Sequence, residues 1–102
     1  GTAAQSGANV IVLVIDNGTY GTIRMHQERH YPRRVSGTGL VNPDFAALGS
    51  AYGMFTRHID ATGDFAPAFE EAMNANRPAL LHIRTDPEVL TPTTTIADLR
   101  GD

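Results

Sequence analysis

The tripeptide Asn17-Gly18-Thr19 holds the chain's best candidates for binding a hard cation. Magnesium accepts an amide side-chain oxygen and a backbone carbonyl as ligands, and it usually completes its coordination shell with phosphate oxygens and water. The tripeptide could therefore coordinate such a cation through a side-chain amide oxygen and a backbone carbonyl. An ordinary turn is the alternative interpretation, because the Asn-Gly dipeptide is common in turns.

The residues that follow this turn predict an anion site. A helix is expected from Tyr20 to about His30, where Pro32 stops it. The first backbone N–H groups of a helix have no internal acceptor, and the helix dipole favours negative charge there. A metal-bridged diphosphate above the amides of Tyr20, Gly21 and Thr22 fits this arrangement.

The histidines are the other candidates for chemistry. His26 and His30 are spaced i, i+4 and could share a metal on one helix face, or they form a solvated or substrate-side pair. His58 and His82 each fall within a strand pattern and are expected to be structural. No acid–base dyad, serine elbow or P-loop lysine is present, so no catalytic residue is predicted.

The apolar run Val10 to Ile15 is the element that positions the candidate site. Such a run predicts a parallel strand that is buried on both faces. In open α/β sheets, ligands bind outside the carboxyl ends of the strands. We therefore expect Asp16 to Gly21 to lie at the mouth of a site. If neighbouring strands are absent, an unpaired edge of this strand favours dimerisation or strand exchange.

Downstream, the sequence predicts a second helix and a second strand. Asn42 is the expected N-cap of the helix, Pro43 its first residue and Gly53 its left-handed stop. The strand is expected from Met54 to Ile59, with Phe55 and Ile59 on one side. The predicted apolar stripe of the helix contains Phe45, Leu48 and Tyr52.

A third helix and a third strand follow. The helix is expected to be capped by Thr62 or Asp64 and to end before Pro78, and the strand is expected from Ala79 to Ile83. The tail from Asp86 to Asp102 is predicted to be extended, with a short turn near Ile96 to Leu99. The predicted apolar stripe of the helix contains Phe65, Phe69, Ala72 and Met73.

This order of elements predicts an α/β fold with three layers, α/β/α, around a small parallel sheet with right-handed crossovers. Residues 1–85 are expected to form the core and residues 86–102 the tail. The chain opens without an initiator methionine, and Ala3-Ala4-Gln5 before Gly7 resembles the last turn of a helix. We therefore expect a piece of a longer polypeptide.

Composition excludes several classes of function. The net charge is −3 with no basic run, so neither a nucleic acid nor an anionic membrane surface is indicated as a partner. The chain has no cysteine, which rules out disulfides, thiolate catalysis and cysteine-bound zinc. No apolar run is long enough to cross a bilayer, and no secretion signal opens the chain, so a cytoplasmic location is expected.

Several blocks of the sequence resemble thiamine-diphosphate-dependent enzymes. Val14 to Arg24 resembles the second half of the thiamine-diphosphate motif, in which a Gly-Asp-Gly triplet is followed further along by an asparagine. Tyr31 to Thr38, Asn42 to Phe45 and Pro78 to Leu80 resemble the acetolactate-synthase-like group. Gly18 to Gly21 also resembles benzoylformate decarboxylase. The blocks occur in the right order over nearly the whole chain.

The resemblance implies roles for particular residues. Asn17 would give its side-chain oxygen to magnesium, and Thr19 would give its backbone carbonyl. Tyr20, Gly21 and Thr22 would approach the diphosphate with backbone groups. The implied fold is an α/β diphosphate-binding domain, of which this chain resembles the carboxyl-terminal part.

The resemblance also places the substrate end of the cofactor near Met25 and His26. Plant, fungal and bacterial acetolactate synthases have a tryptophan where His26 aligns, and they use it to select the second 2-oxo acid. The Gly-Asp-Gly triplet, whose aspartate is the main magnesium ligand, would fall before Gly1. The glutamate that activates the cofactor belongs to a different domain of a neighbouring subunit.

Two functions follow from these observations. In the first, the parent protein is a thiamine-diphosphate- and magnesium-dependent lyase or transferase that acts on a 2-oxo acid as a homo-oligomer, and some relatives also carry FAD. In the second, the chain is an isolated, non-catalytic α/β module that only oligomerises and binds no cofactor.

Overall fold

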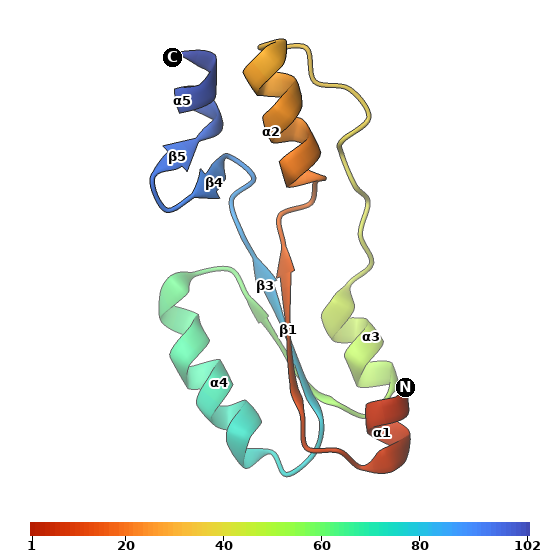
Figure 1. The fold of residues 1–102 in the computed structure, drawn as a ribbon. Helices are drawn as coiled ribbons and strands as arrows, with labels where there is room; N and C mark the ends of the chain where they lie inside the picture. Colours follow the sequence, from red (N-terminus) through yellow and green to blue (C-terminus); the bar gives the residue numbers. More distant parts are fainter. The chain divides into compact units, whose positions relative to one another are not determined.

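Three parallel strands form the predicted sheet in the computed structural model, which describes residues 1–102 (Figure 1). The strands are β1 (Ile11–Asp16), β2 (Phe55–Ile59) and β3 (Ala79–Arg84), and their order in the sheet is β1-β3-β2. Both pairings are parallel, and the register places Val14 of β1 and His58 of β2 on either side of His82. The prediction of an α/β fold with a small parallel sheet is confirmed.

The central strand is β3, and it is more deeply buried than β1. All four residues from Ala79 to His82 are buried, whereas Val12 and Leu13 of β1 are 40% and 43% exposed and Ile15 is 61% exposed. Strand β1 pairs with β3 along one edge only. The expectation that the run Val10 to Ile15 is covered on both faces is therefore wrong for this structure, because the helices that cover the sheet pack against β2 and β3.

Helices α3 (Phe45–Ala51) and α4 (Phe65–Asn74) cover opposite faces of the sheet and complete three layers (Figure 1). A Cβ atom at Gly49 of α3 would lie 2.8 Å from a methyl carbon of Thr56 and 3.2 Å from Leu80. This close approach of α3 to the sheet requires glycine. The buried core on the α4 side contains Phe55, Ile59, Ala68, Ala72, Ala79 and Leu81.

Helix α3 starts later than the sequence predicts. Its N-cap is Asp44, whose Oδ1 accepts a hydrogen bond of 3.0 Å from the backbone N–H of Ala47. The predicted cap, Asn42, instead donates its side-chain amide to Asp16 Oδ1 at 2.8 Å. Asparagine and aspartate are comparable caps, and the long-range partner of Asn42 decides between them.

The predicted apolar stripe of α3 is also wrong in part. Ala46 and Gly49 are the buried residues of the helix, whereas Leu48 is 48% and Tyr52 is 53% exposed. The small residues face the sheet because the helix packs closely against it. The helix ends as predicted, with Gly53 at a φ of 74°.

Helix α4 follows a short 3-10 helix, η1 (Thr62–Asp64). Asp64 is its N-cap, without a side-chain capping hydrogen bond. Of the predicted stripe, Ala72 is buried and the two phenylalanines are partly buried and stacked with ring centroids 5.6 Å apart. Met73 is 58% exposed, so its place in the stripe is wrong.

The remaining elements are α1 (Thr2–Ser6), α2 (Gly21–His30), β4 (Val89–Thr91), β5 (Thr94–Thr95) and α5 (Ile96–Arg100). Helix α1 ends at Gly7, whose φ of 62° is that of a left-handed cap. None of the helices combines the length and the apolar character that a membrane span needs.

The chain folds into two compact units. One contains residues 1–16 and 42–85 and holds the parallel sheet. The other contains residues 17–41 and 86–102, and holds α2, the β4–β5 hairpin and α5. The tail is therefore a hairpin and a helix, not an extended segment with a short turn as predicted. A capping box between Thr95 and Asp98 starts α5, because both side chains satisfy amides of the first turn.

Candidate functional site

The turn that follows β1 in sequence is held in one conformation by its own residues. Asn17 Oδ1 accepts a hydrogen bond of 3.1 Å from the backbone N–H of Thr19, and Gly18 has a φ of 68°. Thr19 forms an isolated antiparallel bridge with Gly39, and its hydroxyl donates to the Thr38 carbonyl at 2.7 Å. The turn is therefore anchored to the loop that follows α2.

The two oxygens predicted to bind a metal differ in how they are used. Asn17 Oδ1 accepts one hydrogen bond, which leaves a lone pair on that oxygen. The backbone carbonyl of Thr19 accepts none from the rest of the chain. Both are neutral oxygen donors of the kind that magnesium accepts beside phosphate and water.

At the start of α2 the structure differs from the expectation for Tyr20. Tyr20 is the N-cap, and its backbone N–H already donates to the Thr38 carbonyl at 2.9 Å. The bridge beside Thr19 therefore occupies one of the three amides predicted to face an anion. Gly21 and Thr22 are the first two residues of the helix, where amides have no intrahelical acceptor.

Four of the predicted site residues line a single pocket of ≈140 Å³: Asn17, Gly21, Thr22 and Met25. The other residues around it are Pro87, Val89 and Leu90, from the segment predicted to be only an extended tail. Thr19 and Asn17 both line a neighbouring pocket of ≈580 Å³. Tyr20 and His26 are exposed and line neither pocket.

The residues around the smaller pocket fit a magnesium-bound diphosphate in their donor types. Gly21 leaves room there, because a Cβ atom at this position would lie 2.8 Å from Asn17 Nδ2. The side-chain oxygen of Asn17 suits magnesium, and the first-turn amides with the space at Gly21 suit a phosphate group. No carboxylate lines this pocket, so a metal held there needs negative charge from phosphate or from another segment.

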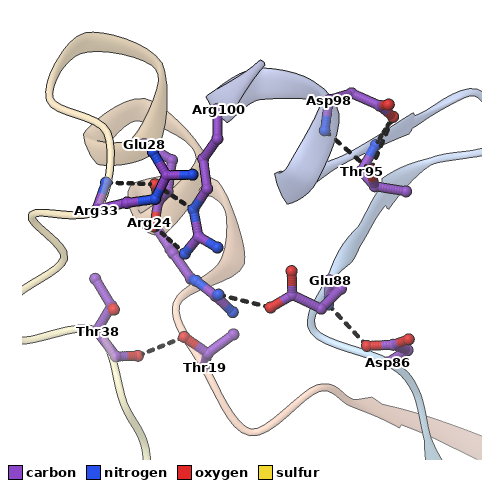
Figure 2. A network of polar contacts seen from close by, with 10 residues as sticks. All are labelled: Thr19, Arg24, Glu28, Arg33, Thr38, Asp86, Glu88, Thr95, Asp98 and Arg100. Carbon is purple, nitrogen blue, oxygen red and sulfur yellow. Dashed lines mark hydrogen bonds and ion pairs between the residues drawn. The ribbon is translucent and has the colours of Figure 1, made fainter. Parts of the chain in front are cut away.

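A buried carboxylate holds together the elements of the unit that contains residues 17–41 and 86–102 (Figure 2). Glu28 of α2 is fully buried and accepts hydrogen bonds from Arg100 Nε at 2.8 Å, Arg100 Nη2 at 2.6 Å and the Arg33 backbone N–H at 2.9 Å. The Arg100 guanidinium, followed by the Arg33 amide, lowers the pKa of Glu28 from 4.5 to about 2. Glu28 therefore remains ionised at neutral pH and ties α2 to α5.

A second ion pair reaches the segment that walls the small pocket. Arg24 Nη2 of α2 donates to Glu88 Oε1 at 2.7 Å (Figure 2). Glu88 lies between Pro87 and Val89, which line that pocket with Leu90. This pair therefore positions one wall of the pocket against α2.

Sequence reasoning missed the role of Glu28. Glu28 is the buried residue of α2 although it is charged, whereas the apolar Ile23 of the same helix is 52% exposed. Arg100, the partner of Glu28, lies 72 residues away, so no local pattern reports the contact. The capping box at Thr95 and Asp98 was the available signal for α5.

Asp16, predicted to lie at the mouth of the site, belongs to a separate buried network. Its Oδ1 accepts a hydrogen bond from Asn42, and its Oδ2 lies 2.7 Å from His82 Nε2 and 3.3 Å from Arg84 Nη1. The carboxylate is thus held by side chains of the sheet unit. It acts there as an anchor of the strand ends.

The sequence of this chain matches a known family over most of its length. Residues 1–83 match the family described as "Thiamine pyrophosphate enzyme, C-terminal TPP binding domain". The α/β fold described above is consistent with that assignment. The chain belongs to this family.

Named relatives give the same family. The chain is 32% identical over 87 residues to the acetolactate synthase isozyme 2 large subunit of Escherichia coli, with 84% of the chain and 16% of the relative covered. It is 32% identical over 88 residues to a probable acetolactate synthase large subunit of Methanococcus aeolicus (85% and 15%). It is 27% identical over 84 residues to a benzoylformate decarboxylase of Pseudomonas aeruginosa (82% and 16%). The chain thus spans about a sixth of the length of these relatives.

Proposed function

We propose that this chain supplies the Asn-Gly-Thr half of a magnesium and diphosphate site in a thiamine-diphosphate-dependent enzyme that acts on a 2-oxo acid. The observation that carries the proposal is that Asn17, Gly21, Thr22 and Met25 line one pocket. Membership of the family makes thiamine diphosphate the cofactor to expect in such a pocket.

Each residue has a stated task in this proposal. The side-chain oxygen of Asn17 and the free carbonyl of Thr19 hold magnesium, and the amides of Gly21 and Thr22 bind the diphosphate. Met25, in the same pocket, lies beside the substrate end of the cofactor, with His26 next to it on α2. The bound cofactor supplies the electron sink for breaking the bond beside the keto group.

The proposed substrate class comes from the relatives. Benzoylformate is a 2-oxo acid, and acetolactate synthase is the other activity that the relatives' names give. The proposed reaction is therefore decarboxylation of a 2-oxo acid or its joining to a second one. We also propose a cytoplasmic homo-oligomer, in which a second subunit and other segments complete the site, since no residue of this chain is proposed to be catalytic.

Calorimetry with the full-length polypeptide that carries these residues tests the proposal. We expect Asn17→Ala to weaken thiamine diphosphate binding in the presence of magnesium by about 10-fold or more, as the loss of a metal-site contact does. Asn74→Ala, which changes an exposed residue in the sheet unit, is the matched control and should bind as the wild type. Equal affinity of wild type and Asn17→Ala contradicts the proposed role.

Activity is tested separately. We expect thiamine-dependent release of carbon dioxide by the full-length polypeptide from at least one member of a panel of pyruvate, benzoylformate and a branched 2-oxo acid. No release from any of them, by protein that binds the cofactor, contradicts the proposed substrate class.

For the 102 residues alone we propose that the affinity for magnesium and thiamine diphosphate is low. The proposed ligands Asn17 and Thr19 offer magnesium two neutral oxygens, and no carboxylate lines the smaller pocket. Mg²⁺ sites in proteins usually include one or two carboxylates. Calorimetry of the isolated chain with magnesium and thiamine diphosphate should show no binding tighter than millimolar. A micromolar dissociation constant contradicts this and makes the chain a sufficient site.

A further inference from the structure

The sheet unit brings together two histidines and an aspartate that the proposed cofactor site does not use. His58 of β2 and His82 of β3 are register partners on adjacent strands, and their ring centroids are 5.2 Å apart. Asp44, the N-cap of α3, places its Oδ1 3.1 Å from His58 Nε2. One ligand atom from each of the three residues lies within 4.8 Å of the others.

The position of this cluster follows from the fold. Partners in a parallel register point to the same face of the sheet, and His82 makes an edge contact at 5.2 Å with Phe45, the first residue of α3. The histidines therefore lie on the face of the sheet that α3 covers. The Asp44 carboxylate lies beside them, at the N-terminus of that helix. The cluster lies within one compact unit of the chain.

His82 is prepared for a ligand in a second, independent way. It is 4% exposed, its Nε2 lies 2.7 Å from Asp16 Oδ2, and its Nδ1 is the buried side-chain atom without a hydrogen-bond partner. An imidazole that donates Nε2–H to a carboxylate keeps its lone pair on Nδ1. A carboxylate behind a histidine is the arrangement that fixes the tautomer and raises the basicity of metal-binding histidines.

We infer that Asp44, His58 and His82 form a binding site for a divalent transition metal of the zinc type. Two imidazoles and one carboxylate are a common catalytic zinc ligand set, and they leave a fourth position for water or a ligand. Imidazole nitrogens favour zinc and its neighbours, whereas magnesium favours oxygen. The site is therefore distinct in chemistry from the proposed magnesium site at Asn17.

Metal binding requires the three ligand atoms, which lie within 4.8 Å of one another, to move closer together. Zinc bonds of about 2.0–2.2 Å in a tetrahedral site separate the ligand atoms by about 3.3–3.6 Å. The side chains of His58 and Asp44 are 48% and 53% exposed and can rotate toward His82. The contact between them would be exchanged for two bonds to one metal ion, while Asp16 holds His82 in place.

Zinc titration of the chain in competition with a coloured chelator, without thiamine diphosphate or magnesium, tests the inference. We expect one Zn²⁺ per chain with micromolar affinity or tighter, and Co²⁺ should give the intense visible absorption of a four-coordinate site. Asp44→Asn and His58→Asn should each weaken Zn²⁺ binding by about 10-fold or more. Asparagine at position 44 keeps the helix cap, so Asp44→Asn separates binding from folding.

The matched control is His30→Asn, which changes the exposed histidine pair on α2 in the other unit. It should bind Zn²⁺ as the wild type does. Absence of stoichiometric binding overturns the inference, and so does wild-type affinity in both Asp44→Asn and His58→Asn. Loss of binding in His30→Asn alone also overturns it and assigns the metal to His26 and His30.

Discussion

At Gly21, a single hydrogen atom in place of a side chain determines where Asn17 can lie. A methyl group there would come within 2.8 Å of Asn17 Nδ2, so the Gly21→Ala variant should displace the proposed magnesium ligand. The φ of Gly21 is not positive, and alanine favours helices, so the unfolding free energy should change little. We expect about 10-fold weaker binding of thiamine diphosphate to the full-length polypeptide, measured by calorimetry beside a thermal melt.

Gly63→Ala is the control for this variant, because a Cβ atom at Gly63 would meet nothing within 4 Å and its φ is not positive either. It should leave cofactor affinity unchanged. If Gly21→Ala binds the cofactor as tightly as Gly63→Ala does, the geometry of Asn17 is not what limits binding.

Glu28 predicts a specific dependence of stability on pH. Its pKa falls from 4.5 in the unfolded chain to about 2 in the fold, chiefly because Arg100 binds the carboxylate. A lowered pKa gives stability that is fully present above pH 4.5 and is lost as the pH falls toward about 2. We expect the thermal midpoint of the wild type to drop across this window, and Glu28→Gln to be less stable at pH 7 with a weaker dependence.

The exposed pair Arg57–Glu71 supplies the control, because its side chains are about half exposed and such pairs contribute little. Glu71→Gln should have the midpoint of the wild type at pH 7. If Glu28→Gln were as stable as Glu71→Gln, the buried carboxylate would not hold α2 and α5 together.

The contacts of a side chain could be predicted from the sequence only where its partners are close to it in the chain. The Asn-Gly-Thr turn bonds to itself, so its residue types indicate a turn that could bind a cation, and the resemblance to a known family assigned its ligands. Glu28 is buried by Arg100, and His82 meets Asp16 66 residues away. Such pairs depend on the packing of distant elements, and periodicity within one helix or strand does not report them.

At the scale of elements, the capping box of α5 predicts a stability effect. The Thr95 hydroxyl accepts from the Asp98 backbone N–H, and Asp98 accepts from the Thr95 backbone N–H. Thr95→Ala should lower the free energy of unfolding by about 1 kcal/mol, as cap removal usually does. Chemical denaturation measures this, with Thr85→Ala, an exposed threonine outside the helices, as control. Equal effects of both variants would mean that α5 contributes nothing to global stability.

Elements were easier to predict than the faces they bury. All three strands of the sheet lie where apolar runs placed them, but the run in β1 is an edge and the run in β3 is the centre. An apolar run indicates that a strand can be buried, whereas the elements packed against the strand determine which of its side chains are buried. For the same reason, α3 turns Ala46 and Gly49 to the sheet although Leu48 is more apolar.

At the scale of the whole molecule, the compact units are not continuous stretches of the sequence. Each unit is built from two separate stretches, 1–16 with 42–85 and 17–41 with 86–102. The expected division into a core of residues 1–85 and a tail remains a proposal about the domain. The proposed magnesium ligands belong to one unit and the proposed zinc ligands to the other, so the two proposals can be tested independently.

The exposed edge of the sheet carries the last prediction. Strand β1 has a partner on one side only, and its apolar residues include Ile15, which is 61% exposed. Unpaired edges with apolar side chains favour association with further chains, so the 102-residue chain should sediment above its monomer mass. Ile15→Lys places a charge on that edge and should shift the mass toward the monomer, at a cost within about 0.5 kcal/mol of stability because the side chain is exposed. Val41→Lys, at a fully exposed position in the other unit, should leave the mass unchanged. If both variants sediment at the same mass as the wild type, the chains associate through a surface other than β1. The β1 edge must then be protected from pairing with another chain by its own twist or by neighbouring side chains.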